Sequence, residues 1–257
     1  MKVFLSAIDA GKNFDLFPMK YNLMSYFYLT KQKESYIKEV IKNSELILID
    51  SGAHSFQKRK KVNWEEYTQK YAGWIKRNDC DKILGYFEMD IDPAGYPYEF
   101  VLHLRSILES VSDKIIPVWH KNRGINDYIE MCKKYSGKII AITGFKNEDI
   151  KDDQYIKFLK VAWKYNCKVH CLGMTRTKVL DKVPFDYVDS SSWRQNAVYG
   201  NVFKGKKLMR ERDLPKEKVN IIYKMAYLKG MKMQEHYENK WRSFSEKRNN
   251  MVNADSC

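Results

Sequence analysis

Paired cysteines and long apolar runs are both missing from this sequence of 257 residues. The five cysteines are odd in number and show no paired spacing, which predicts free thiols in a reducing compartment. No apolar run approaches the roughly 18 residues that a membrane span needs. The first residues, Met1–Leu5, have the pattern of a strand and not of a signal peptide. We therefore expect a soluble, cytoplasmic protein with no membrane partner.

A glycine-rich phosphate loop is missing as well. Such a loop follows the first strand of a doubly wound sheet that binds dinucleotides. Here the first predicted strand leads through Ser6–Lys12, a stretch with a single glycine. The doubly wound sheet is therefore the weaker of the two α/β architectures that fit the rest of the chain.

Acidic residues are too few to balance the basic ones. The formal net charge is +14, and the sequence pI is about 9.3. Between residues 204 and 248 there are 14 Lys or Arg against 6 Asp or Glu, a local excess of +8. A basic surface suits a polyanion such as nucleic acid, because phosphate neutralisation releases counterions. A solvated helix face is the alternative interpretation of the same charges.

Short β-rich runs alternate with stretches whose apolar residues recur at helical spacing. The helical stretches include residues 36–41, 67–75, 101–108 and 155–162. The predicted strands are Lys2–Ile8, Leu46–Asp50, Ile83–Glu88, Lys114–Trp119, Lys138–Thr143, Lys168–Leu172, Phe185–Asp189 and Asn201–Phe203. Strands that alternate with helices predict parallel pairing through right-handed crossovers. Eight such units in about 250 residues predict a (β/α)8 TIM barrel.

The C-terminal part has a different pattern. Residues 1–214 are predicted to form the barrel, and residues 215–257 a basic helix and tail packed on it. The helix is expected from Pro215 to about Trp241, with a frayed polar tail from Ser243 onward.

Polar side chains gather where the predicted strands end. Asp50 closes one strand and Asp189 another, and each is followed by a serine-containing turn. Other strands are followed by Glu88, Asp90, Asp92, His120, Thr143, Gly144, Phe145, His170 and Gly173. Because the carboxyl ends of barrel strands form the active-site mouth, we expect these residues to share one site.

Carboxylates that face one pocket are typical of acid/base and nucleophilic chemistry at a glycosidic carbon. An aspartate after a strand also commonly caps the next helix, but here Ser51 and Ser190 could cap instead. The aspartates and histidines could alternatively hold a divalent metal ion. Trp119, Trp193 and Phe145 could sandwich a planar base, although aromatic residues at a barrel mouth are also ordinary packing.

At these residues the chain resembles the tRNA-guanine transglycosylase family. That family has an Asp-Ser-Gly-Gly-Phe-Gln motif after one strand, and Asp50–Gln57 matches it through Gly52. The family's nucleophile lies in a Phe-Asp-Cys-Val-x-Pro-Thr-Arg motif, and Asp189 stands at the corresponding place, with Gly200 eleven residues later. The family's base-recognising aspartate resembles Asp90. The resemblance covers roughly residues 45–203.

Two departures from the family narrow the resemblance. The zinc subdomain, with its Cys-x-Cys-x-x-Cys…His ligands, is missing, and the chain is short for a bacterial tRNA enzyme. The stretches Val169–Gly173 and Val188–Trp193 look closer to a compact phage-type branch, whose members exchange guanine in DNA for a 7-deazaguanine. If a phage encodes the protein, the cytoplasm is that of its host.

The resemblance implies a role for each site residue. Asp189 would attack C1′ of a guanosine, Asp50 would transfer protons, and Asp90 would accept hydrogen bonds from the base. The remaining base-binding residues would be Ser51, Asp92, His120, Gly144, Phe145, His170 and Gly173, with Gly144 and Gly173 letting backbone approach the base. Residues that would contact the nucleic-acid backbone are Arg194, Lys204, Lys206, Lys207 and Arg210.

The expected partners are DNA, in preference to tRNA, and a free 7-deazaguanine, with no metal and no cofactor. A homodimer or a partner protein is compatible with the sequence. Three alternatives stay open: a tRNA enzyme, a metal-dependent barrel hydrolase that uses the aspartates and histidines, and a binding protein without activity.

Overall fold

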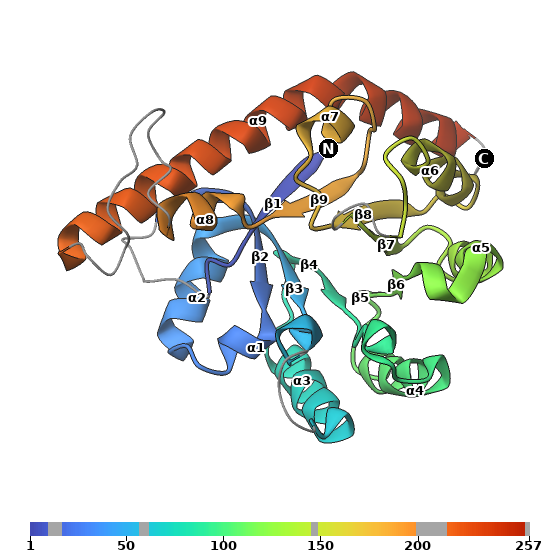
Figure 1. Cartoon of the computed structure of the whole chain (residues 1–257), viewed down its shortest axis with the longest axis horizontal. Helices are drawn as coiled ribbons and strands as arrows, with labels where there is room; N and C mark the ends of the chain where they lie inside the picture. The colour runs from blue at the N-terminus through green and yellow to red at the C-terminus, as the bar shows by residue number, and fades with distance from the viewer. Residues whose placement is uncertain (10–16, 57–61, 145–148, 199–214, 255–257) are drawn as a thin grey trace.

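The strands form a single parallel sheet that curves into a barrel. A computed structural model describes residues 1–9, 17–56, 62–144, 149–198 and 215–254 (Figure 1). Within these ranges the strand order is β5-β4-β3-β2-β1-β9-β8-β7-β6, and every pair is parallel. The strands are β1 (Lys2–Ser6), β2 (Met19–Ser25), β3 (Ser44–Asp50), β4 (Ile83–Phe87), β5 (Ile115–Ile116), β6 (Val118–Trp119), β7 (Ile139–Thr143), β8 (Lys168–Leu172) and β9 (Tyr187–Ser190).

Only Pro117 separates β5 from β6, so the two ends of the strand order are consecutive in the chain and the barrel is nearly closed. Proline has no backbone N–H and interrupts the ladder there. The carboxylate of Glu88 compensates in part by accepting the Val118 N–H at 2.5 Å. The predicted strand Lys114–Trp119 is thus two short strands. If they are counted as one, the sheet has the eight positions of a TIM-like barrel.

The sequence did not predict β2, which pairs with both β1 and β3. At its centre lies Asn22, a polar residue that breaks the apolar run and is nevertheless fully buried. Its amide nitrogen donates to Ser44 Oγ at 2.9 Å, and its oxygen accepts from the Tyr227 hydroxyl at 2.7 Å. Satisfied hydrogen bonds let a polar side chain occupy such a position. Asp50 therefore closes the third strand and not the second, and the predicted strand Asn201–Phe203 lies outside the described residues.

Helices surround the barrel (Figure 1). They are α1 (Tyr26–Leu29), α2 (Glu34–Asn43), α3 (Trp64–Asn78), α4 (Tyr98–Glu109), α5 (Gly124–Lys134), α6 (Tyr155–Lys164), α7 (Thr177–Leu180), α8 (Ser192–Val198) and α9 (Lys216–Ala254). The four stretches with predicted helical spacing are α2, α3, α4 and α6, which confirms those predictions. The local sequence specifies where α3 begins, because the Asn63 side chain accepts the Glu66 N–H at 3.2 Å and caps the helix.

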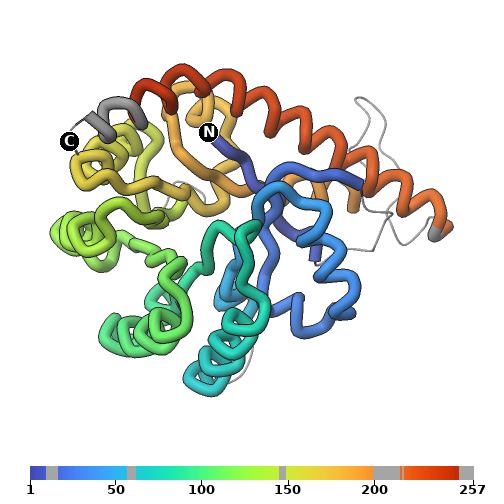
Figure 2. Tube along the Cα trace, turned by 180° about the vertical axis from the view of Figure 1, so that it is seen from behind, coloured from blue at the N-terminus to red at the C-terminus, as the bar shows by residue number. Residues whose placement is uncertain are grey.

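The last helix is longer than predicted. α9 continues to Ala254, so the expectation of a frayed tail from Ser243 was wrong. Figure 2 shows α9 running along one side of the molecule. It crosses β1 and β2, where the buried Gln234 donates to the carbonyls of Val3 (2.8 Å) and Tyr21 (2.7 Å). Gly230 permits this approach, since a Cβ there would lie 2.8 Å from Leu5.

None of the helices within the described ranges combines the length and the apolar character needed to cross a membrane.

Strand alternation places an apolar layer inside the barrel and a polar layer above it. The inner cluster contains Phe4, Tyr21, Leu23, Leu48, Phe87, Ile116, Val118, Ala141 and Tyr187. Two residues further along several of these strands, the side chains point to the same side as the apolar layer and lie at the carboxyl end of the barrel. The residues reached in this way are Ser6, Ser25, Asp50, His120, Thr143 and Asp189. All six line one pocket.

Candidate active site

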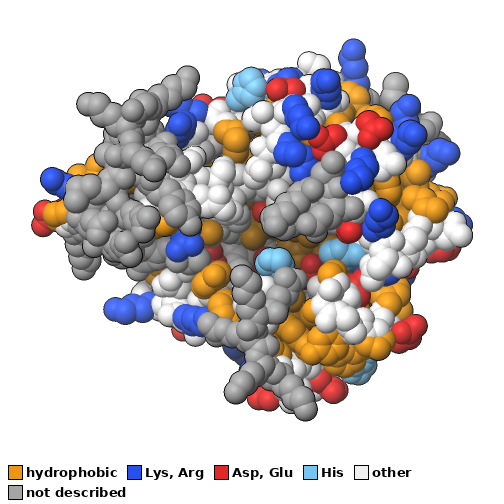
Figure 3. Space-filling view, viewed as in Figure 1, with side chains coloured by type: hydrophobic (Ala, Val, Ile, Leu, Met, Phe, Trp, Pro, Cys, Tyr) orange, Lys and Arg blue, Asp and Glu red, His pale blue; other side chains and the backbone are white. Residues whose placement is uncertain are grey.

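The pocket at the carboxyl ends of the strands has a volume of about 820 Å³, within the range of small-molecule sites. Its apolar walls include Leu23, Tyr28, Pro93, Ala94 and Leu172. Figure 3 shows the hollow near the centre of this face, with histidine side chains visible beside it. An apolar wall interrupted by a few polar groups suits a planar, hydrogen-bonding ligand.

The pocket is acidic although the chain as a whole is basic. Five aspartates line it: Asp9, Asp50, Asp90, Asp149 and Asp189. His54 and His120 also line it, and the described lining residues include no Lys or Arg. The lining therefore favours ligands that donate hydrogen bonds or carry positive charge.

Asp50 sits in a turn that only glycine permits. Its Oδ2 accepts the Gly52 N–H at 2.9 Å. Gly52 has a φ of +81°, and a Cβ there would lie 2.5 Å from Phe27 Cβ, so a larger residue is excluded. Burial and the charges of Asp90 and Asp189 raise the pKa of Asp50 to about 7, against the opposing effects of Gly52 and Ser25. Such a carboxyl can give or take a proton near neutral pH.

Asp189 is held by two donors on one oxygen. Its Oδ1 accepts the Gly173 N–H at 2.7 Å and lies 3.1 Å from His170 Nε2. Gly173 has a φ of +63°, which directs the chain back after β8. No hydrogen bond to Oδ2 is present among the described residues. The arrangement fixes one oxygen of Asp189 and leaves the other for a ligand in the pocket.

His170 does not line the pocket, contrary to the prediction that it binds a base. Its side chain is fully buried, with ring centroids 5.0 Å from Phe87 and 6.2 Å from Phe4. The reason is register: His170 is level with Tyr187 on the neighbouring strand, two residues before Asp189. His170 lies one layer beneath the pocket and orients Asp189 from below.

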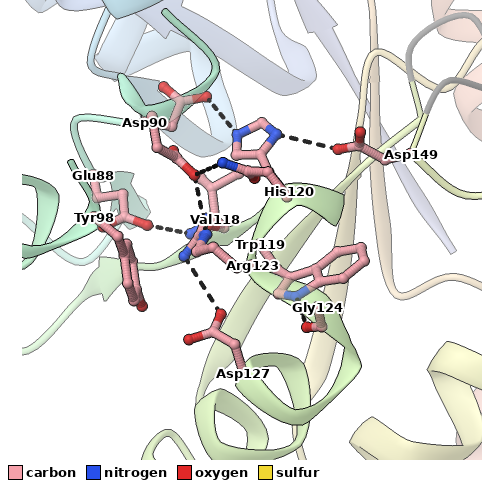
Figure 4. Close-up of polar contacts among 12 residues, drawn as sticks. Glu88, Asp90, Tyr98, Val118, Trp119, His120, Arg123, Gly124, Asp127 and Asp149 are labelled. Carbon is pink, nitrogen blue, oxygen red and sulfur yellow. Dashed lines mark hydrogen bonds and ion pairs between the residues drawn. The ribbon is translucent and has the colours of Figure 1, made fainter. Parts of the chain in front are cut away.

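His120 lies between two carboxylates. Its Nδ1 is 3.2 Å from Asp149 Oδ2, and its Nε2 is 3.6 Å from Asp90 Oδ2 (Figure 4). Burial lowers the pKa of His120, but the interactions with Asp149 and Asp90 prevail and raise it to about 9. The pKa of Asp149 is lowered. Burial raises it, but the hydrogen bond to His120 and the charge of that ring outweigh burial. His120 is therefore a cation at neutral pH.

Two further acids at the strand ends belong to the surrounding structure. Asp92 was predicted to bind the base, but it does not line the pocket: its Oδ2 lies 3.1 Å from Arg123 Nε, and both side chains are almost fully buried. Glu88 points outward, where its carboxylate binds Arg105 at 2.6 and 3.0 Å. Figure 4 shows Arg123 next to Tyr98 and Asp127, away from His120's carboxylate partners. Both acids compensate buried arginines.

The other predicted base-binding residues divide between pocket and packing. Gly173 lines the pocket, whereas Gly144 and Ser51 do not. A Cβ on Gly144 would meet Cys171 Sγ at 2.8 Å, so its small size serves packing against β8 and not the approach of a ligand. Ser51 is fully buried, and its carbonyl accepts from the Tyr67 hydroxyl at 2.9 Å.

Only one of the residues predicted to contact a nucleic-acid backbone, Arg194, belongs to the described part of the chain. Lys204, Lys206, Lys207 and Arg210 lie outside the described residues, as does the base-binding candidate Phe145. Arg194 lies on α8 and does not line the pocket.

Sequence reasoning missed Asp9 and Asp149. Asp9 lies three residues after β1 and is almost fully buried, and its Oδ2 accepts the Ser25 N–H at 2.5 Å. Asp149 lies six residues beyond β7, too far to belong to a strand-end motif. Asp9 could have been found from its place after the first strand. Asp149 could not, because only the fold brings it to His120.

No group of three His, Cys, Asp or Glu side chains in the described parts of the chain is arranged to hold a metal ion. The pocket aspartates instead lie in separate environments: a turn for Asp50, a histidine for Asp90 and Asp149, and two N–H donors for Asp189.

The fold and the site define an α/β protein with a parallel, barrel-like sheet and an acidic pocket at the carboxyl ends of its strands. Comparison of the chain with protein-family models, with curated proteins and with solved structures gave no match.

Proposed function

We propose that the protein is an enzyme, a nucleic-acid guanine transglycosylase that exchanges guanine for a 7-deazaguanine through a covalent aspartyl intermediate. In this proposal the fold is a (β/α)8 barrel with a basic C-terminal helix and no zinc subdomain. The observation that carries the proposal is the presence of Asp50, Asp90 and Asp189 in one pocket, each with different partners. Carboxylates in different environments take different chemical roles.

In the first half-reaction, Oδ2 of Asp189 attacks C1′ of the target nucleotide. The C1′–N9 bond breaks, its electron pair leaves with guanine, and Asp50 supplies the proton that neutralises the departing base. The pKa of Asp50, about 7, suits it to this transfer. Gly173 and His170 keep Asp189 pointed at C1′, because they fix its other oxygen.

In the second half-reaction, the incoming 7-deazaguanine gives its N9 proton to Asp50. Its N9 then attacks C1′, the C1′–Oδ2 bond breaks, and Asp189 is restored as a carboxylate. Asp50 ends the cycle protonated, as it began, so protons balance over the two halves. Asp90 accepts the N1–H and amino hydrogens of the purine, a pairing that guanine offers and adenine does not.

The polymer is proposed to be DNA, with tRNA as the alternative. The net charge of +14 favours a polyanion, and the acidic pocket itself repels phosphate, so the backbone would run over the surrounding surface. A base inside a duplex cannot reach the pocket, so the target nucleotide must be flipped out or single-stranded. No specific observation favours the metal-dependent hydrolase.

The test is incubation of the folded protein with labelled guanine or a labelled 7-deazaguanine and, in parallel, single-stranded DNA, duplex DNA and tRNA. We expect label in DNA and a covalent protein–DNA adduct on denaturing gels. Asp189→Asn should abolish the adduct, a loss of about 1,000-fold or more, while the exposed control Asp153→Asn retains it. Incorporation into no polymer, or an adduct that persists in Asp189→Asn, would contradict the proposal.

A further inference from the structure

The surroundings of His120 assign it a role that the transglycosylase scheme leaves open. The residue follows β6, while its two acidic neighbours come from other parts of the barrel, Asp90 after β4 and Asp149 after β7. The ring is only 14% exposed. An imidazole whose two nitrogens both face carboxylates can donate to both only in its protonated form. The geometry by itself therefore favours the cation.

The two contacts of His120 are unequal. Nδ1 lies within hydrogen-bond distance of Asp149 at 3.2 Å. Nε2 is buried and has no hydrogen-bond partner among the described residues, with Asp90 at 3.6 Å as its charged neighbour. Asp149 is thus the anchor that holds the ring, and Asp90 keeps most of its hydrogen-bonding capacity for a ligand.

Asp90 acts on the protonation of Asp50. Burial and, after it, the charge of Asp90 raise the pKa of Asp50, because like charges in one pocket repel. Asp90 has a cationic neighbour in His120, whereas the hydrogen-bond donor to Asp50 is the neutral Gly52 N–H. The charge distribution therefore places the negative charge on Asp90 and the proton on Asp50.

We propose that Asp149 and His120 are positioning residues: Asp149 holds His120 as a cation, His120 holds Asp90 as a carboxylate, and the transferable proton is left on Asp50. The inference rests on the proposed function, in which Asp90 must accept two hydrogen bonds and Asp50 must supply a proton. Neither Asp149 nor His120 touches the reacting atoms in this scheme.

Other charged groups around these residues do not change the assignment. His120 is also influenced by Asp92, which is paired with Arg123, and Lys121 lies near Asp149. Asp50 is faced by Asp189, which raises its pKa further, and by the hydroxyls of Tyr67 and Tyr71, which burial keeps neutral.

The first measurement is an NMR titration of the His120 ring, which requires no substrate. In the wild-type protein we expect a midpoint near 9. In Asp149→Asn the midpoint should fall, because the neutral amide no longer stabilises the cation, and Asp149→Glu should largely restore it. The exposed control Asp153→Asn should leave the midpoint unchanged. An unchanged midpoint in Asp149→Asn would overturn the inference.

The second measurement is calorimetric binding of free guanine at pH 6 and pH 8, which does not depend on exchange. Asp149→Asn and, as a second variant, His120→Gln should weaken binding about tenfold at pH 6, because Asp90 then takes up the proton and loses an acceptor. At pH 8 the difference should shrink, because Asp50, with a pKa of about 7, has then lost the proton that could move to Asp90. Equal weakening at both pH values would indicate a merely structural role and overturn the inference.

These readouts separate the two proposals. If guanine binds and the variants behave as expected but no polymer is modified, the proposed transglycosylase function is wrong and the positioning roles stand. If the wild-type protein exchanges guanine but the His120 midpoint is the same in Asp149→Asn, the function stands and the positioning roles are wrong.

Discussion

Two histidine–aspartate pairs lie in the upper part of the barrel, and they differ in what surrounds each ring. His120 lines the pocket and has a carboxylate near each nitrogen, Asp149 at 3.2 Å and Asp90 at 3.6 Å. His170 lies beneath the pocket, with Asp189 at 3.1 Å on one nitrogen. Within the described part of the chain its other nitrogen, Nδ1, is buried without a hydrogen-bond partner, and the ring packs against Phe4 and Phe87.

The difference shows how one residue pair acquires two roles. A ring between two carboxylates gains charge, so His120 acts on the ionisation of its neighbours. A ring between one carboxylate and aromatic side chains gains a fixed position, so His170 acts on the orientation of Asp189. Both pairs consist of a histidine and an aspartate, so the group on the other side of each ring decides which role the histidine has.

The largest expected effect that tests this comparison is a slower formation of the covalent adduct in a variant of His170. His170→Leu removes one of the two donors to Asp189 while keeping the site apolar and filled. We expect adduct formation to slow about 10- to 100-fold, corresponding to a hydrogen bond to a charged group, with an unchanged pH profile. His103→Leu, at an exposed histidine, is the control. A loss confined to high or low pH would mean that His170 acts through its charge, like His120.

The next effect is on the free energy of unfolding. The pKa of His120 is raised to about 9 from an ordinary 6.5, so the stability it contributes is fully present below pH 6.5 and is lost as pH rises through about 9. We expect a decrease on the order of 2 kcal/mol between pH 7 and pH 9.5, measured by urea denaturation. His120→Gln should flatten this dependence, and His170→Leu should preserve it. The reverse pattern would exchange the roles of the two histidines.

The smallest effect concerns the pKa of Asp50, on which the neighbours of both histidines act: Asp90 beside His120 and Asp189 beside His170. Asp90 and Asp189 both raise the pKa of Asp50, and the influence of Asp90 is the larger. Carboxyl NMR titration should therefore show that the Asp50 midpoint, near 7 in the wild-type protein, falls in Asp90→Asn and falls less in Asp189→Asn. A larger fall in Asp189→Asn would make the Asp189 region the stronger electrostatic partner.

The sequence predicted which strand ends form the pocket better than it predicted how deep in the barrel each residue lies. Asp50, Asp90 and Asp189 do line one pocket, because parallel strands end at the same edge of the sheet. His170 and Gly144 were misplaced, since their positions depend on register and on packing against β8. These are properties of pairs of strands, which a single chain segment does not encode.

The remaining differences have similar causes. β2 was missed because Asn22 interrupts its apolar run, and Asn22 is acceptable there only because Ser44 and Tyr227 satisfy it. Asp149 was missed because its partner His120 is distant in sequence and meets it only in the folded barrel. Local periodicity predicts where elements form, whereas such polar partnerships depend on the assembled structure.

The hydrogen bonds between Gln234 and β1 and β2 have a consequence for the order of folding. Gln234 contacts the carbonyl of Val3, 231 residues earlier in the chain, and Tyr227 contacts Asn22, 205 residues earlier. Closing such long loops is entropically costly and slows folding. During synthesis, the first two strands emerge long before the helix that satisfies their buried polar groups. We expect them to acquire full protection from hydrogen exchange only once α9 has docked.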